Sequence, residues 1–324
     1  MDYILLVVGL GLLLLAANYL VDSSVAIAQR AKISNFIIGL TIVGIGTSAP
    51  ELFVSISSAL SGSGDIAMGN VIGSNIANIF LILGLTAIIL PFPIERLQRR
   101  RDIPFLILAT LFVTLIANDS IIPGIKLNKL NNLDGIVLLV CFVAYMGWVI
   151  VQKGKDPKKA IEEADDEAKS SLTGKSPWLL WIIAVISLVG LILGGNLFLD
   201  SAKNLARAWG MSEAVIAITI VAVGTSLPEL VTAVVAASKK NPQLVLGNVI
   251  GSNLFNLLFI LGTSSTIKSM GFVNINIIDY AMMFIGAVML YAVVFTFKKD
   301  KLDRIEGVIF FVIYVVYTVS LLLR

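Results

Sequence analysis

Two copies of one polar motif lie in the middle of long apolar stretches, and no other feature constrains the fold of this sequence as strongly. Residues 46–51 read Gly-Thr-Ser-Ala-Pro-Glu, and residues 224–229 read Gly-Thr-Ser-Leu-Pro-Glu. A charged side chain at bilayer depth costs about 2.5–3.5 kcal/mol on insertion scales, so membrane proteins keep one there for ion or proton movement. The duplicated motif therefore predicts an ion transporter.

The composition is that of an integral membrane protein. Of the 324 residues, 57% are hydrophobic and 14% are charged, whereas a soluble domain has about 25% charged residues. The apolar run after Asp2 follows no Lys or Arg, so it reads as a retained helix and not as a signal peptide. Cys141 is the only cysteine and there is no histidine, which favours hard cations with oxygen ligands.

Ten apolar stretches are candidate membrane spans, since a helix needs about 20 apolar residues to cross the hydrocarbon core. They are residues 3–21, 36–60, 66–90, 103–118, 133–152, 177–199, 214–237, 243–267, 277–297 and 306–323. A polar segment, 153–176, separates the fifth from the sixth. We therefore expect three parts: 1–152, a linker at 153–176, and 177–324.

The two halves are repeats. Adding 178 to a position in 36–84 gives its counterpart in 214–262, and the two segments share 22 identities in 49 positions. Five spans in each half make the second half enter the membrane from the opposite side, which is the inverted-repeat plan of many secondary transporters. We expect an all-α membrane protein of ten transmembrane helices, in two inverted five-helix repeats with broken core helices.

The basic residues give an orientation. Alternating spans leave six of the 24 Lys and Arg residues on the side of the termini and 18 on the side of the linker. The positive-inside rule makes the linker side cytoplasmic, with both termini extracellular.

The proline of the first motif predicts a break in the second span. Pro50 has no amide hydrogen to donate and pushes Ala49 away from helical geometry, so the helix should break at 47–49. Such a break is tolerated at this depth only where it is buried in protein or lines a cavity. The freed carbonyls, the Thr47 and Ser48 hydroxyls and the Glu51 carboxylate can then bind a cation. The repeat offers Ala222, Thr225, Ser226 and Glu229. The alternative for a single copy is a kinked helix whose glutamate is hydrogen-bonded to a neighbour.

A second motif, Gly-Asn-Val-Ile-Gly-Ser-Asn, occurs identically at 69–75 and 247–253. Ser74 and Asn78 share one helix face, as do Ser252 and Asn256, and we predict that these four are ligands. The glycines, Asn70 and Asn248 have the simpler interpretation of helix packing. The pairs Asp22-Ser23 and Asp200-Ser201 are predicted helix caps.

These residues resemble the calcium/cation antiporter superfamily, specifically the prokaryotic sodium/calcium exchangers, whose two α-repeats match both pairs of motifs. The resemblance implies a core of spans two, three, seven and eight, with spans one and six lying across it. It implies Ca²⁺ ligation by Glu51, Glu229 and the carbonyls of Thr47 and Thr225. It further implies Na⁺ ligands at Ser48, Ser74, Ser226, Ser252 and the carbonyls of Gly44 and Ala222, with Asn78 and Asn256 at the centre. Asn256 replaces an Asp of the potassium-dependent branch.

The function that we predict is secondary-active, electrogenic and K⁺-independent exchange of Na⁺ for Ca²⁺ by alternating access in a prokaryotic cytoplasmic membrane. Two alternatives stay open: a Ca²⁺/H⁺ antiporter that uses the same two glutamates, and a cation channel. We expect no enzymatic activity, cofactor, nucleic-acid partner or obligate protein partner, and the bilayer and the two transported ions are the expected partners.

Overall fold

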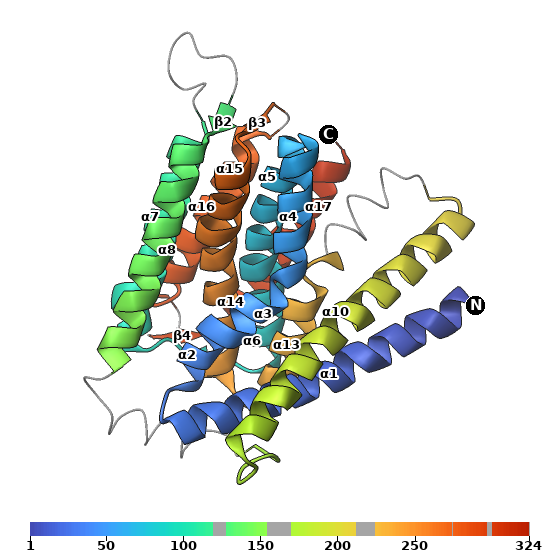
Figure 1. The fold of residues 1–324 in the computed structure, drawn as a ribbon, viewed down its shortest axis with the longest axis vertical. Coiled ribbons are helices and arrows are strands. Elements are labelled where there is room, and N and C mark those ends of the chain that lie inside the picture. The colour runs from blue at the N-terminus through green and yellow to red at the C-terminus, as the bar shows by residue number, and fades with distance from the viewer. Residues whose placement is uncertain (119–127, 154–169, 212–223, 274, 297–299, 324) are drawn as a thin grey trace.

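A computed structural model of the chain describes residues 1–118, 128–153, 170–211, 224–273, 275–296 and 300–323. Most of these residues lie in helices, which pack together as a bundle (Figure 1). The helices of the first half are α1 (Asp2–Ala31), α2 (Asn35–Ile38), η1 (Gly39–Val43), α3 (Gly44–Thr47), α4 (Ala49–Ser61), α5 (Gly64–Ile76), η2 (Ala77–Leu83), α6 (Gly84–Ile89), η3 (Gln98–Asp102), α7 (Ile103–Ile116) and α8 (Asn132–Lys153). Those of the second half are α10 (Pro177–Ala208), α13 (Leu227–Ser238), α14 (Pro242–Leu254), η6 (Phe255–Ile260), α15 (Leu261–Ile267), α16 (Ile277–Ala292) and α17 (Arg304–Leu322).

Six of these helices or continuous helix runs are long and apolar enough to cross a membrane, and a seventh span results if the bent pair 35–47 and 49–61 is counted as one. Three of the ten expected spans correspond to shorter apolar helices, which are α7, α13 and α16. The first part of the span expected at 214–237 lies outside the described residues. The structure therefore supports an integral membrane protein with six to seven candidate spans.

Two helix runs form the centre of the bundle. The continuous run of α5, η2 and α6 is 72% buried over its most apolar window, and the run of α14, η6 and α15 is 94% buried. The outer helices α8 and α17 are only 28% and 17% buried, and their exposed faces are apolar, as a lipid-facing surface requires. Both central runs change to π-helical turns near their middle, at Ala77–Leu83 and Phe255–Ile260. Such turns disturb the regular helix ladder and are frequent at functional sites.

The helices α1 and α10 form an oblique antiparallel pair across one side of the bundle (Figure 1). Glycines allow their backbones to meet. A Cβ atom on Gly9 would lie 2.7 Å from the Phe198 nitrogen, and one on Gly194 would lie 2.9 Å from the Leu13 nitrogen. Close approach through small residues is the usual way in which helices associate in a membrane.

Short antiparallel strand pairs join the loops at the two ends of the bundle. Strand β1 (Phe92–Pro93) pairs with β4 (Lys301–Leu302), so that Phe92 faces Leu302. Strand β2 (Asn128–Leu130) pairs with β3 (Met270–Phe272), so that Asn128 faces Phe272. These strands depart from the expected all-α class, and each pair links a loop of one half to a loop of the other.

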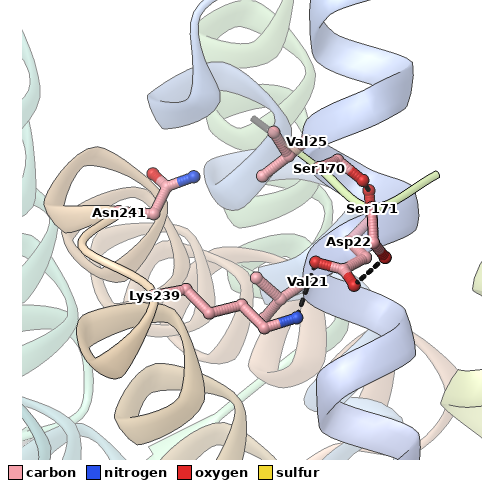
Figure 2. A pocket seen from close by; sticks show the side chains of 7 residues that line it. All are labelled: Val21, Asp22, Val25, Ser170, Ser171, Lys239 and Asn241. Carbon is pink, nitrogen blue, oxygen red and sulfur yellow. Dashed lines mark hydrogen bonds and ion pairs between the residues drawn. The ribbon is translucent and has the colours of Figure 1, made fainter. Parts of the chain in front are cut away.

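The predicted caps at Asp22 and Asp200 are wrong, because α1 and α10 continue unbroken past both positions. The Asp22 carboxylate binds Lys239 at 2.6 Å and Ser171 at 2.6 Å. Figure 2 shows this carboxylate between the end of the linker and the turn that precedes α14, beside a cavity of about 280 Å³. Asp200 binds Lys203 of its own helix. Side-chain partners thus satisfy both acids without interrupting either helix.

We expect Lys239→Met to lower the free energy of unfolding by about 1–2 kcal/mol. A surface ion pair contributes little, whereas breaking a buried pair costs about 3–5 kcal/mol. The Lys239 and Asp22 side chains are 28% and 12% exposed, so we expect a value between these two limits. Thermal melting in detergent would measure the change. Lys240→Met is the matched control, since Lys240 is exposed. Equal melting temperatures for the two variants would contradict the prediction.

Candidate functional site

The two motif glutamates lie buried in the centre of the bundle. Glu51 is in the first turn of α4 and Glu229 is in the first turn of α13, and each is 1% exposed. In both halves the helix begins directly after a non-helical serine, with φ and ψ of −82° and 12° at Ser48 and −85° and 8° at Ser226. The first break bends the chain by 46°. The predicted break at 47–49 is therefore confirmed, and in the second half α13 begins at the matching position.

Each glutamate accepts a hydrogen bond from the serine of the opposite half. The Ser48 hydroxyl donates to Glu229 Oε1 at 2.7 Å, and the Ser226 hydroxyl donates to Glu51 Oε1 at 3.4 Å. The second carboxylate oxygen of each glutamate, Oε2, is buried without a hydrogen-bond partner in the described part of the chain. The halves thus contribute equivalent groups to one shared site.

Two asparagines of the second motif hold the helix starts that carry the glutamates. The Asn70 side chain donates to the Glu51 carbonyl at 3.2 Å and to the Ser55 hydroxyl at 3.0 Å. The Asn248 side chain donates to the Glu229 carbonyl at 3.5 Å. The packing role predicted for Asn70 and Asn248 agrees with these bonds, which fix α4 against α5 and α13 against α14.

Two further predicted ligands, Thr47 and Ser252, contact groups of the opposite half. The Thr47 hydroxyl donates to the Val43 carbonyl at 3.0 Å and lies 3.4 Å from Asn248 Oδ1. The Ser252 hydroxyl donates to the Gly44 carbonyl at 3.1 Å. By the repeat offset, the counterpart of this bond would run from the Ser74 hydroxyl to the Ala222 carbonyl, and Ala222 lies outside the described residues. Thr225 lies in the turn before α13 and is half-buried.

Five buried oxygen atoms of the predicted ligands have no hydrogen-bond partner among the described residues. They are Glu51 Oε2, Glu229 Oε2, Ser74 Oγ, Asn78 Oδ1 and Asn256 Oδ1. A buried polar atom without a partner costs about 1–3 kcal/mol, so a set of five calls for a ligand. Carboxylate, hydroxyl and amide oxygens are the donors that Ca²⁺ prefers, and Na⁺ accepts the same oxygens.

Two functional candidates were missed from the sequence alone, namely Asn75 and Asn253. Asn253 accepts a hydrogen bond from the Asn78 side chain at 3.1 Å, across the two halves. The signal was present in the identical second motif, which ends on these two asparagines.

Two buried carboxylates in a bundle that contains apolar helices of membrane length are typical of a membrane protein that transports ions. The model of the family described as sodium/calcium exchanger protein matches residues 1–151 and 179–323. The chain belongs to this family of ion antiporters.

Relatives and solved structures of the same family cover almost the whole chain. An uncharacterized membrane protein of Methanocaldococcus jannaschii, MJ0091, is 34% identical over 97% of this chain and 95% of its own length. The sodium/calcium exchanger MaX1 of Methanosarcina acetivorans is 30% identical over 99% and 98%. The structure of the sodium-calcium exchanger NCX_Mj in Na⁺ without Ca²⁺ superposes with a TM-score of 0.80 at 32% identity, covering 98% of both chains.

Proposed function

We propose that this chain exchanges Na⁺ for Ca²⁺ across a cytoplasmic membrane by alternating access, normally extruding Ca²⁺ against the Na⁺ gradient. The observation that carries the proposal is the pair of buried glutamates, each bonded by a serine of the opposite half and each with one unpartnered oxygen. Two negative charges match one Ca²⁺, and the surrounding neutral oxygens suit Na⁺. The named activities of MaX1 and NCX_Mj point to the same pair of ions.

The proposed architecture is ten transmembrane helices in two inverted repeats, 1–152 and 177–324, around this site. The reciprocal serine–glutamate bonds support a pseudo-twofold relation between the halves. The loop contacts support the sidedness. β1 meets β4 at the end assigned to the linker, and β2 meets β3 at the end assigned to the termini. The excess of Lys and Arg on the linker side makes that side cytoplasmic and both termini extracellular.

The proposed site residues are the twelve predicted from the sequence. Glu51, Glu229, Thr47 and Thr225 bind Ca²⁺, and Gly44, Ser48, Ser74, Ala222, Ser226 and Ser252 bind Na⁺, with Asn78 and Asn256 between the two halves. Asparagine at both central positions leaves two carboxylates in the site, and we therefore propose that exchange needs no K⁺. Three or more Na⁺ ions per Ca²⁺ would move net charge, and we propose this electrogenic mode.

Radiolabelled Ca²⁺ uptake into proteoliposomes tests the proposal directly. We expect strong uptake with an internal Na⁺ load and background uptake with K⁺ or choline, with external K⁺ having no effect. A positive internal potential, set with K⁺ and valinomycin, should change the initial rate in Na⁺-loaded vesicles. Uptake driven by a pH gradient without Na⁺ would instead support Ca²⁺/H⁺ exchange, and flux without any counter-ion in the vesicle lumen would support a channel.

A further inference from the structure

The asparagines that end the two copies of the second motif make different hydrogen bonds, although the two copies are identical in sequence. Asn253 of α14 reaches across to the other half and accepts a bond from Asn78 Nδ2 at 3.1 Å. Its counterpart Asn75 of α5 stays within its own half, where its amide donates to the Val71 carbonyl at 2.7 Å. The halves therefore differ here, whereas they match at the glutamates.

The bond that would mirror Asn78–Asn253 is missing, and both of its atoms lack a partner. Equivalent positions differ by 178, so the counterpart of Asn78 is Asn256 and the counterpart of Asn253 is Asn75. Asn75 Oδ1, an acceptor, and Asn256 Nδ2, a donor, are each buried and have no hydrogen-bond partner among the described residues. All four side chains are at most 2% exposed, so water does not readily replace the absent bond.

We infer that Asn75 and Asn253 are positioning residues that alternate during transport, so that Asn253 holds Asn78 in the conformation seen here and Asn75 holds Asn256 in the oppositely facing one. This inference rests on the proposed function. In inverted repeats each half takes the other's place when the access side changes, so a bond made by one half in one state is made by its counterpart in the other. A buried amide left unpaired is costly, which favours one formed bond in each state.

The alternation determines which central amide is fixed. While Asn253 accepts from Asn78 Nδ2, the Asn78 amide cannot rotate, and its Oδ1 remains available as a ligand. Asn256 has neither amide atom hydrogen-bonded within the described part, so no hydrogen bond fixes the orientation of its amide. The ion site would therefore have one fixed and one adaptable amide in each state, and the two would exchange roles.

The test compares Asn253→Ala with Asn75→Ala in right-side-out and everted membrane vesicles from the same cells. The half-saturating Ca²⁺ concentration for Na⁺-dependent exchange is measured at each membrane face, and the ratio of the two values reports the balance of the two conformations. We expect the ratio to shift about fivefold in one direction for Asn253→Ala and about fivefold in the other for Asn75→Ala, as for the loss of one buried hydrogen bond. The double variant should return close to the wild-type ratio.

Thr86→Val and Ser265→Ala serve as controls, one in each half. Both side chains are buried, and each donates a hydrogen bond to a carbonyl of its own helix run, Thr86 to Ile82 at 2.7 Å and Ser265 to Leu261 at 2.6 Å, so neither should shift the ratio. A general packing role for Asn75 and Asn253 would lower stability or rate without opposite shifts. Size-exclusion chromatography checks folding, and Asn→Ser variants at both positions replace any alanine variant that fails, with the same signs expected.

Shifts in the same direction, or none, in variants that still exchange Na⁺ for Ca²⁺ would overturn the inference and leave the proposed function standing. Absence of Na⁺-dependent exchange in the wild-type vesicles would instead overturn the proposed function itself.

Discussion

Glu51→Gln and Glu229→Gln are each expected to abolish Na⁺-dependent Ca²⁺ uptake while the protein remains folded. Glutamine has the shape of glutamate and keeps an oxygen that can accept the serine bond of the opposite half, at 2.7 Å for Glu229. It removes one of the two charges that hold Ca²⁺. Breaking a buried charge pair costs about 3–5 kcal/mol, which is more than a hundredfold in affinity. Radiolabelled Ca²⁺ uptake in proteoliposomes measures the loss of transport, and size-exclusion profiles show whether each variant remains folded.

Glu95→Gln is the matched control for these two variants. Glu95 lies on the loop between β1 and η3, away from the site, and its side chain is half-buried. The same chemical change there should leave uptake near the wild-type rate. Near-normal uptake in either Glu51→Gln or Glu229→Gln would show that Ca²⁺ is bound elsewhere.

The local break in the helices could be predicted from the sequence because its cause is local. Pro50 and Pro228 lack an amide hydrogen, so each fits the first turn of a helix and not its interior. The preceding residues, Ala49 and Leu227, are already helical, so the expected loss of helical geometry at Ala49 is wrong and the non-helical residue is the serine before it. The structure accordingly ends α3 at Thr47 and begins α4 at Ala49, and it begins α13 at Leu227. Composition and hydropathy likewise predict apolar helices of membrane length, since the bilayer sets that length, and the described part of the chain contains six to seven of the ten expected.

The pairing within the site could not be predicted in the same way. The offset of 178 between the repeats identifies equivalent residues, but it does not predict which residues are in contact. Ser48 bonds Glu229 and not Glu51 of its own motif. Asn75 and Asn253 occupy identical seven-residue motifs, yet their side chains bond different groups. These contacts depend on how the two halves pack, which local sequence does not encode.

The wrong caps at Asp22 and Asp200 have a related cause. A polar residue inside an apolar helix needs a partner, and a local cap is the nearest one that the sequence offers. For Asp22 the partners come instead from distant segments, at Ser171 and Lys239. The helix can then continue to Ala31. Tertiary contacts therefore satisfy Asp22 without ending the helix there.

Gly251→Ala is expected to disrupt the core and to abolish transport with it. The added Cβ atom would clash with the Leu40 carbonyl oxygen and would lie 2.7 Å from the Leu40 Cα, so α14 and η1 would have to separate. Overpacking in a core costs about 1–3 kcal/mol and occasionally more, and contact with backbone leaves no flexible side chain to yield. The neighbouring Ser252–Gly44 bond at 3.1 Å would be displaced, which links the packing defect to the ion site.

Fluorescence-detected size-exclusion chromatography and thermal melting would measure the loss, which we expect as a severalfold lower yield of monodisperse protein and a lower melting temperature. Gly147→Ala is the matched control, because Gly147 lies on the exposed face of α8 and an added Cβ there meets no atom of the described chain within 4 Å. The control should keep wild-type yield, and alanine favours a helix over glycine by about 1 kcal/mol. Since alanine improves helix propensity equally at both positions, a loss at Gly251 alone must come from the contact with η1. Wild-type stability and uptake in Gly251→Ala would mean that α14 and η1 do not approach this closely.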